Sequence, residues 1–190
     1  MSLIRWAFTI VAFPIGGWIA FQLVGSVEGA LTAAGAAAIA GAVIGTAQGL
    51  ALGRRIGWRW AIATLVGMVV GVTLSALVTG AATTVAALGV TGLITGVMVG
   101  AAQALTLRQG WRVLAVWTAV VGLAWSAGWV ISANVIAVNV DSGFVTFGLS
   151  GALLVTVATA VVLRRILGRV VKRPAAVTPV PAECATAASR

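Results

Sequence analysis

The sequence predicts an all-α integral membrane protein with six transmembrane helices, arranged as three tandem helical hairpins. Of the 190 residues, 61% are hydrophobic and only 8% are charged, and the mean hydropathy is +1.14. A soluble domain needs roughly a quarter of charged residues to cover its surface. Long apolar runs separated by basic clusters make up the chain to about residue 170. Both observations favour a chain whose surface faces lipid.

Each apolar run has about 20 residues or more, enough to cross a hydrocarbon core of about 30 Å. A cleaved signal peptide is the alternative for the first run, but such signals have only about 7–15 apolar residues. Pro14 is expected to release the carbonyl of Ile10 and to kink this helix near Gly16 and Gly17. The predicted spans are 6–26, 29–52, 58–80, 86–107, 111–134 and 143–163, in one transmembrane domain of residues 1–170.

The charges predict the orientation of these spans. Basic residues cluster at the N-terminus and at the ends of the even-numbered spans, whereas Glu28 and Asp141 lie in turns on the other side. Because cytoplasmic loops retain positive charge, we expect both termini in the cytoplasm and the chain in the plasma membrane. Residues 171–190 form a Pro/Ala-rich tail with little to bury, which predicts disorder. The arginines assigned to topology and lipid headgroups are Arg54, Arg55, Arg59, Arg108, Arg112, Arg164 and Arg165.

A net charge of +9 would indicate nucleic acid in a soluble protein. Here the basic clusters lie between apolar runs, so they indicate the bilayer and its anionic headgroups as partners and argue against nucleic acid. Another membrane protein or a second copy of the chain is the further partner expected.

Glutamine and arginine positions recur along the sequence at a nearly constant spacing. Gln48 and Gln103 are 55 residues apart, Arg54 and Arg108 are 54 apart, and Arg108 and Arg164 are 56 apart. Each unit contains two spans, so successive copies have the same orientation and form parallel repeats rather than inverted ones. Three such units predict a pseudo-threefold arrangement.

Glycines in the even-numbered spans and in the third follow helical spacing. Glycines four residues apart let helix backbones approach closely in lipid, where no hydrophobic drive holds helices together. These faces are therefore predicted to pack helices. The packing glycines are Gly41, Gly45, Gly67, Gly71, Gly96, Gly100 and Gly151.

Gln48 and Gln103 are the most informative polar residues. They precede an arginine by six and five residues, which places them roughly 8–9 Å inside the cytoplasmic edge. A buried amide needs hydrogen-bond partners, so the structural hypothesis is that these glutamines bond neighbouring helices. The functional hypothesis is that Gln48, Gln103 and Thr159 converge on the axis to form a polar constriction or solute site.

The aromatic residues suggest contact with the membrane. Trp6, Trp58, Trp60 and Trp111 lie beside the inner arginines, as in an interfacial belt. A stripe of Trp117, Val121, Trp125 and Trp129 on the fifth span is expected to face lipid or the interface. A flat apolar ligand such as a carotenoid or quinone is the alternative for this stripe.

No catalytic constellation stands out. The tetrad from Gly148 to Gly151 resembles the GxSG of rhomboid intramembrane proteases, in which a histidine activates the serine. This chain has no histidine, so Ser150 has no such base. With no histidine and the single Cys184, we expect no metal, no cofactor and no enzyme activity. No charged residue is predicted deep in a span, which argues against an ion-coupled transporter.

The repeated element GxxxGxxQxxxLR, at about 41–55 and 96–108, resembles one found in small, uncharacterised multi-pass bacterial membrane proteins. The resemblance implies a fold and a place in a bacterial inner (plasma) membrane, and it brings no activity with it. The expected function is therefore that of a non-enzymatic structural or partner subunit that packs through Gly/Ala helix faces. The alternative is a small-solute channel or a substrate-binding transporter subunit that uses Gln48, Gln103 and Thr159.

Overall fold

The computed structural model describes residues 3–54, 56–135 and 144–171, and the regular structure in these ranges is all helical. Six helical segments are long and apolar enough to cross a membrane, the first being α1, η1 and α2 together. The predicted all-α class with six such helices is confirmed. The elements are α1 (Leu3–Ala7), the 3-10 turn η1 (Phe8–Val11), α2 (Ala12–Val24), α3 (Ala30–Leu52), α4 (Gly57–Thr79), α5 (Val85–Leu107), α6 (Trp111–Val135) and α7 (Leu149–Val171).

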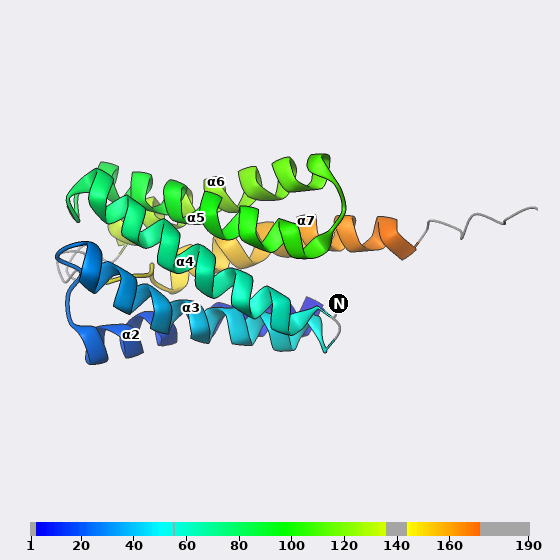
Figure 1. Ribbon diagram of the computed structural model, residues 1–190, viewed down its shortest axis with the longest axis horizontal. Coiled ribbons are helices and arrows are strands. Elements are labelled where there is room, and N and C mark those ends of the chain that lie inside the picture. Colours follow the sequence, from blue (N-terminus) through cyan, green and yellow to red (C-terminus); the bar gives the residue numbers. More distant parts are fainter. Residues whose placement is uncertain (1–2, 55, 136–143, 172–190) are drawn as a thin grey trace, which may run out of the picture.

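The helices form a bundle along one common long axis (Figure 1). From α2 to α7 each helix packs against the next in the chain, and α1, η1 and α2 also contact α7. The N-terminus lies at the same end of the bundle as the end of α7 (Figure 1). The first and last helical segments are therefore neighbours in space.

Short turns join the helices, and glycine makes several of them possible. Helices α3 and α4 end at Gly53 and Gly80, with φ of 83° and 62°. These positive values suit glycine because it has no Cβ to clash with the backbone. Helix α5 ends instead at Arg108 in the left-handed conformation, φ 52°, and begins at Thr84, whose side chain accepts a hydrogen bond from the Ala87 N–H.

The first segment departs from α-geometry in a different place from the one predicted. The irregular turn is η1, immediately before α2, whereas Gly16 and Gly17 lie within regular α-helix. Pro14 has no N–H to donate to Ile10, so the preceding turn can adopt the tighter 3-10 spacing. The Ala12 N–H accordingly donates to the carbonyl of Thr9.

The last helix begins at Leu149 and continues to Val171, later at both ends than the predicted span of 143–163. The five residues before it, 144–148, enter the bundle, and Phe147 is 1% exposed. The Thr146 hydroxyl donates a hydrogen bond of 2.9 Å to the Phe13 carbonyl of α2. The expected outer loop at 135–142, with Asn139 and Asp141, and the tail at 172–190 lie outside the described residues, except Val135 at the end of α6.

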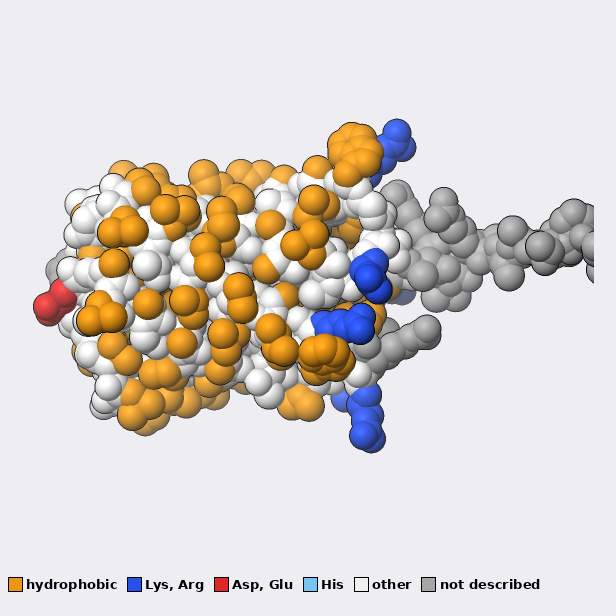
Figure 2. All heavy atoms as spheres, viewed as in Figure 1, with side chains coloured by type: hydrophobic (Ala, Val, Ile, Leu, Met, Phe, Trp, Pro, Cys, Tyr) orange, Lys and Arg blue, Asp and Glu red, His pale blue; other side chains and the backbone are white. Residues whose placement is uncertain are grey.

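Charged side chains lie at the two ends of the bundle. The described arginine side chains gather at one end of the molecule, and the described acidic side chain lies at the other (Figure 2). Between the ends, the visible surface carries hydrophobic and other uncharged side chains. This distribution suits a protein whose middle lies in lipid.

Candidate functional site

Gln48 and Gln103 meet inside the bundle, together with Trp60, Thr64 and Trp117. We call these five residues the Gln–Trp cluster. The two glutamines are 6% and 3% exposed, and the other three side chains are completely buried. They come from α3, α4, α5 and α6. Four helices therefore contribute to one polar centre.

Hydrogen bonds between helices connect the cluster. Gln48 Oε1 accepts from Trp60 Nε1 at 2.9 Å and from Gln103 Nε2 at 3.2 Å. Gln103 Nε2 also donates to Thr64 Oγ1 at 2.9 Å, and Gln103 Oε1 accepts from Trp117 Nε1 at 3.1 Å. The Thr64 hydroxyl in turn donates to the Trp60 carbonyl. Each glutamine oxygen thus accepts an indole N–H from the helix that follows its own.

Thr159 lies in a related position without touching either glutamine through a described hydrogen bond. Its hydroxyl accepts from Trp6 Nε1 at 3.3 Å, and the same indole reaches the Thr156 carbonyl at 3.3 Å. The Thr159 hydroxyl donates to the carbonyl of Val155 at 2.6 Å. The link from Thr159 to the Gln–Trp cluster therefore runs through the Trp6 ring.

Three indole rings form a continuous edge-to-face row in the interior. The centroids of Trp6 and Trp60 are 6.2 Å apart with an interplanar angle of 80°, and those of Trp60 and Trp117 are 5.6 Å apart with an angle of 62°. These are favourable aromatic geometries. The row joins the Thr159 hydroxyl to the two glutamines by direct ring contact.

Several tryptophans were predicted in the wrong environment. Trp6 and Trp60 were expected in the interfacial belt but are 1% and 0% exposed. Trp58 and Trp111 do face outward, and each lies beneath the guanidinium of the next residue, at 5.2 and 5.8 Å from the ring centroid. The N–H of a tryptophan that has an acceptor inside the protein does not require water or a headgroup at the membrane interface.

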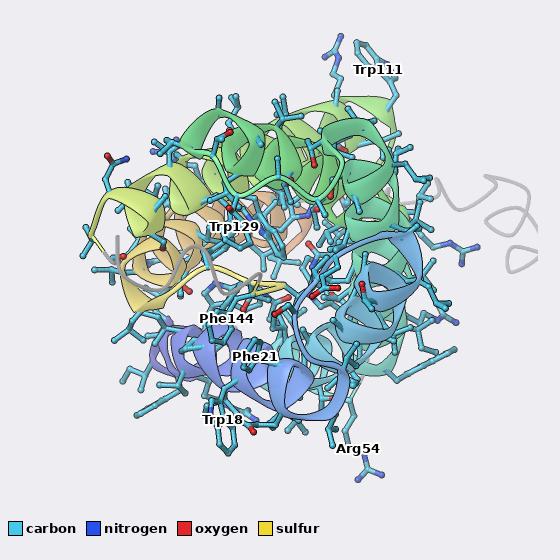
Figure 3. All side chains as sticks on the ribbon, turned by 90° about the vertical axis from the view of Figure 1, so that its left-hand side faces the viewer. Trp18, Phe21, Arg54, Trp111, Trp129 and Phe144 are labelled. Carbon is cyan, nitrogen blue, oxygen red and sulfur yellow. The ribbon has the colours of Figure 1, made fainter. Side chains whose placement is uncertain are left out.

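The stripe on α6 was also predicted wrongly, because it faces the interior rather than lipid. Trp117, Trp125 and Trp129 are 0%, 2% and 6% exposed. The rings of Trp125 and Trp129 contact Phe147 edge to face, at 5.2 and 5.9 Å. Figure 3 shows Trp129 pointing into the bundle, whereas Trp18 and Trp111 point away from it. Phe147 thus covers the rings of Trp125 and Trp129, whereas the ring of Trp117 packs against Trp60.

The seven glycines singled out from the sequence all lie against a neighbouring helix of this chain. Gly41 and Gly45 face α4, Gly67 and Gly71 face α5, Gly96, Gly100 and Gly151 face α6. At Gly45 an added Cβ would lie 2.7 Å from the Ala61 carbonyl oxygen, and at Gly67 it would lie 2.6 Å from the Val99 Cα. Such distances leave no room for a side chain.

The described arginines assigned to headgroups are all exposed, namely Arg54, Arg59, Arg108, Arg112, Arg164 and Arg165, while Arg55 lies outside the described residues. The first four lie in turns or in the first turn of a helix, whereas Arg164 and Arg165 lie within α7. Arg5 lies at the same end and donates a hydrogen bond of 2.9 Å to the Leu50 carbonyl. None of these arginines enters the Gln–Trp cluster, whose members are all uncharged.

The cluster offers hydrogen bonding but no acid, base or nucleophile of catalytic strength. Amide and indole groups stay neutral across the accessible pH range. The described contact of Ser150 is with the Ser132 hydroxyl, at 3.4 Å. No group of three His, Cys, Asp or Glu residues that could hold a metal occurs in the described part of the chain.

Sequence reasoning found the glutamines but missed their indole partners. A signal was present, because Trp60, Thr64 and Gly67 are spaced to share one face of α4, which Gly71 extends.

No protein-family model matches the chain, and the searches of curated proteins and of solved structures found no match either.

Proposed function

We propose that this chain is a non-enzymatic polytopic membrane protein, a structural or partner subunit of a bacterial inner membrane. The observation that supports this best is the hydrogen bonding of the Gln–Trp cluster. Both glutamine oxygens and the Gln103 amide nitrogen already have partners on neighbouring helices. Such hydrogen bonds hold neighbouring helices together. A buried amide needs these partners because lipid offers it none.

We also propose that the six helices are three tandem parallel-repeat hairpins, α1–α3, α4–α5 and α6–α7. The order of indole donors and acceptors supports this. Trp60 of the second hairpin donates to Gln48 of the first, and Trp117 of the third donates to Gln103 of the second. Trp6 of the first donates to Thr159 of the third. The order is cyclic, as a pseudo-threefold arrangement requires.

The arginine end of the bundle is proposed to face the cytoplasm, with both termini inside. The support is the concentration of the described arginine side chains at one end, with the described acidic residue, Glu28, at the other (Figure 2). A second support is the pair of exposed indoles, Trp58 and Trp111, beside those arginines. Such rings are favoured at the level of the headgroups.

A partner subunit would contact the outward faces rather than the GxxxG faces. The glycine faces are occupied by helices of the same chain, as at Gly41 and Gly96. The outward surface carries large apolar side chains such as Leu31, Leu77 and Leu123, which are 87%, 68% and 65% exposed. We therefore place lipid or a partner on those faces.

A small-solute channel or transporter subunit is the second candidate, and one observation favours it. Gln48 Nε2 has no hydrogen-bond acceptor among the described residues. This leaves the two N–H donors of one amide in the cluster, which a polar solute would satisfy. In this alternative, Gln48, Gln103 and Thr159 form the polar part of the route.

Replacing both glutamines distinguishes the two functions. Gln48→Leu with Gln103→Leu removes the hydrogen bonds between helices, which are worth about 0.6 kcal/mol each on average in membranes and at most about 1.7. We expect the free energy of unfolding in mixed detergent micelles to fall by about 2 kcal/mol or more. Wild-type proteoliposomes should be no more permeable to small polar solutes than empty liposomes.

The matched control is Gln22→Leu, since Gln22 is an exposed glutamine of α2. It should leave the unfolding transition in place. Solute flux through the wild type that disappears in a stably folded double variant would reverse the order of the two candidates.

A further inference from the structure

A groove runs between α1 and α7 at the arginine end of the bundle, where the first and last helical segments meet. Its volume is about 590 Å³, compared with about 450 and 260 Å³ for two other grooves at this end. Its lining residues are Leu3, Trp6, Ala7, Thr156, Val157, Ala160, Val161, Arg164 and Arg165. Apart from Thr156, the wall is apolar along its length, and it is basic at one end.

The length of the groove matches one leaflet of a membrane. Thr156 and Arg165 are nine residues apart on α7, which gives a rise of about 13 Å, close to half of a hydrocarbon core of about 30 Å. The apolar residues therefore lie at the depth of acyl chains. Arg164 and Arg165 then lie at the depth of the phosphates.

The basic end of the groove has no described acidic neighbour. Glu28 is the described carboxylate, and it lies in the turn between α2 and α3, at the opposite end of the bundle (Figure 2). Arg164 and Arg165 are both exposed. An anion from outside the chain is the natural partner for two adjacent guanidinium groups.

We propose that this groove, which we call the α1–α7 groove, binds one acidic phospholipid of the inner leaflet. Its phosphate contacts Arg164 and Arg165, and an acyl chain lies along Ala7, Val157 and Val161. The proposal rests on the membrane orientation given under Proposed function. It goes beyond a general attraction of basic loops to headgroups, because it assigns one binding site to one phospholipid molecule.

A second copy of the chain is a poorer occupant of the groove. Two copies inserted in the same direction would bring their arginine ends together, and like charges repel. The glycine faces that usually bring membrane helices into close contact are already buried within the chain, as at Gly45 and Gly151. A phospholipid supplies both the missing negative charge and the apolar chain.

Native mass spectrometry of the full chain tests this. The protein is released from mild detergent micelles that contain equal amounts of phosphatidylglycerol and phosphatidylcholine with the same acyl chains. We expect phosphatidylglycerol to be retained in preference to phosphatidylcholine. Arg164→Gln with Arg165→Gln should lower its retention about tenfold or more, since each arginine contributes to anionic lipid binding.

Two variants fill the groove without changing charge: Ala160→Phe and Val157→Trp. Val157 is 54% exposed, so its replacement should not disturb the fold. Both variants should lower the retention of phosphatidylglycerol about as much as the double arginine variant does. The matched control is Arg54→Gln with Arg112→Gln, which removes the same charge from the same end outside the groove, and it should change retention less than twofold.

Three results would overturn the proposal. These are an equal loss of lipid in the control variant, equal retention of the two lipids by the wild type, and a dimer without bound lipid that the groove-filling variants dissociate. A wrong orientation would be recognised separately, by a C-terminal reporter found outside the cell. If only the proposed lipid-binding site is wrong, the C-terminal reporter will still be found inside the cell.

Discussion

The indole N–H groups of Trp60 and Trp117 donate to glutamine oxygens rather than to water or headgroups. An unsatisfied N–H in hydrocarbon costs several kcal/mol, so each indole needs an acceptor wherever it is buried. The glutamine supplies it, and the ring fills the surrounding space. Trp60 and Gln48 together thus behave as one packing unit with an internal hydrogen bond.

A double-mutant cycle measures this unit. Trp60→Phe removes one of the two donors to Gln48 Oε1, and Gln48→Leu leaves the buried Trp60 N–H without an acceptor, so each should destabilise the bundle. The double variant should lose less than the sum, with a coupling of about 0.5–1.7 kcal/mol in the unfolding free energy. Trp58→Phe with Gln48→Leu is the control, since Trp58 is 60% exposed and should show no coupling. Strict additivity in the first pair would contradict the assignment.

The burial of the two glutamines could be predicted from the sequence, but the direction of the tryptophans could not. Gln48 and Gln103 are amides within long apolar runs, so each needs a hydrogen-bond partner on another helix. Trp6 and Trp60, by contrast, are apolar residues in an apolar stretch, and lipid and protein interior are equally apolar. Only the hydrogen-bond partner decides which side such a ring faces, and that partner comes from another helix.

Among the helices, α3 and α4 approach each other most closely where glycine meets glycine. An added Cβ at Gly49 would lie 2.5 Å from the carbonyl oxygen of Gly57. Gly57 opens α4, four residues after the end of α3 at Gly53. The tight turn and the tight crossing therefore depend on each other.

Gly49→Ala should force these two backbones apart. We expect a loss of about 1–3 kcal/mol in unfolding free energy, the usual cost of overpacking. Gly35→Ala is the matched control in the same helix, because its Cβ would meet the Val24 side chain at an ordinary 3.7 Å. Measurement is by the denaturing-detergent midpoint of each variant, and equal midpoints would show that the crossing relaxes without cost.

The positions of the helices followed from the lengths of apolar runs, but two local features did not. The 3-10 turn η1 reflects the missing N–H of Pro14, one turn further along the chain, and a pattern of hydropathy carries no such information. The segment 144–148 enters the bundle because Phe147 packs among Phe13, Trp125 and Trp129. That contact joins three distant parts of the chain and has no local signature.

Across the whole molecule, charge divides the bundle into a basic end and an acidic end (Figure 2). The surface between them is apolar, with exposed side chains such as Phe8 and Leu105 at 71% and 67%. Such a surface is stable only in lipid or in detergent. The charge asymmetry then determines which way the bundle inserts.

Cysteine labelling tests this orientation in intact cells. In a background with Cys184→Ser, Glu28→Cys should react with a membrane-impermeant maleimide from outside, because Glu28 is exposed in a turn opposite the arginines. Arg112→Cys should react only after the cells are opened. The reverse pattern would show that the arginine end faces outward.

The contact of Trp6 with α7 has a consequence for the synthesis and membrane insertion of the protein. Its hydrogen-bond acceptors, Thr156 and Thr159, are 150 and 153 residues further along the chain. At a synthesis rate of about 5–20 residues per second, roughly 8–30 s pass before those residues follow Trp6 from the ribosome. During that interval the first inserted helix has an open flank, available to lipid or to the insertion machinery. The bundle is complete only once its last helix has been made.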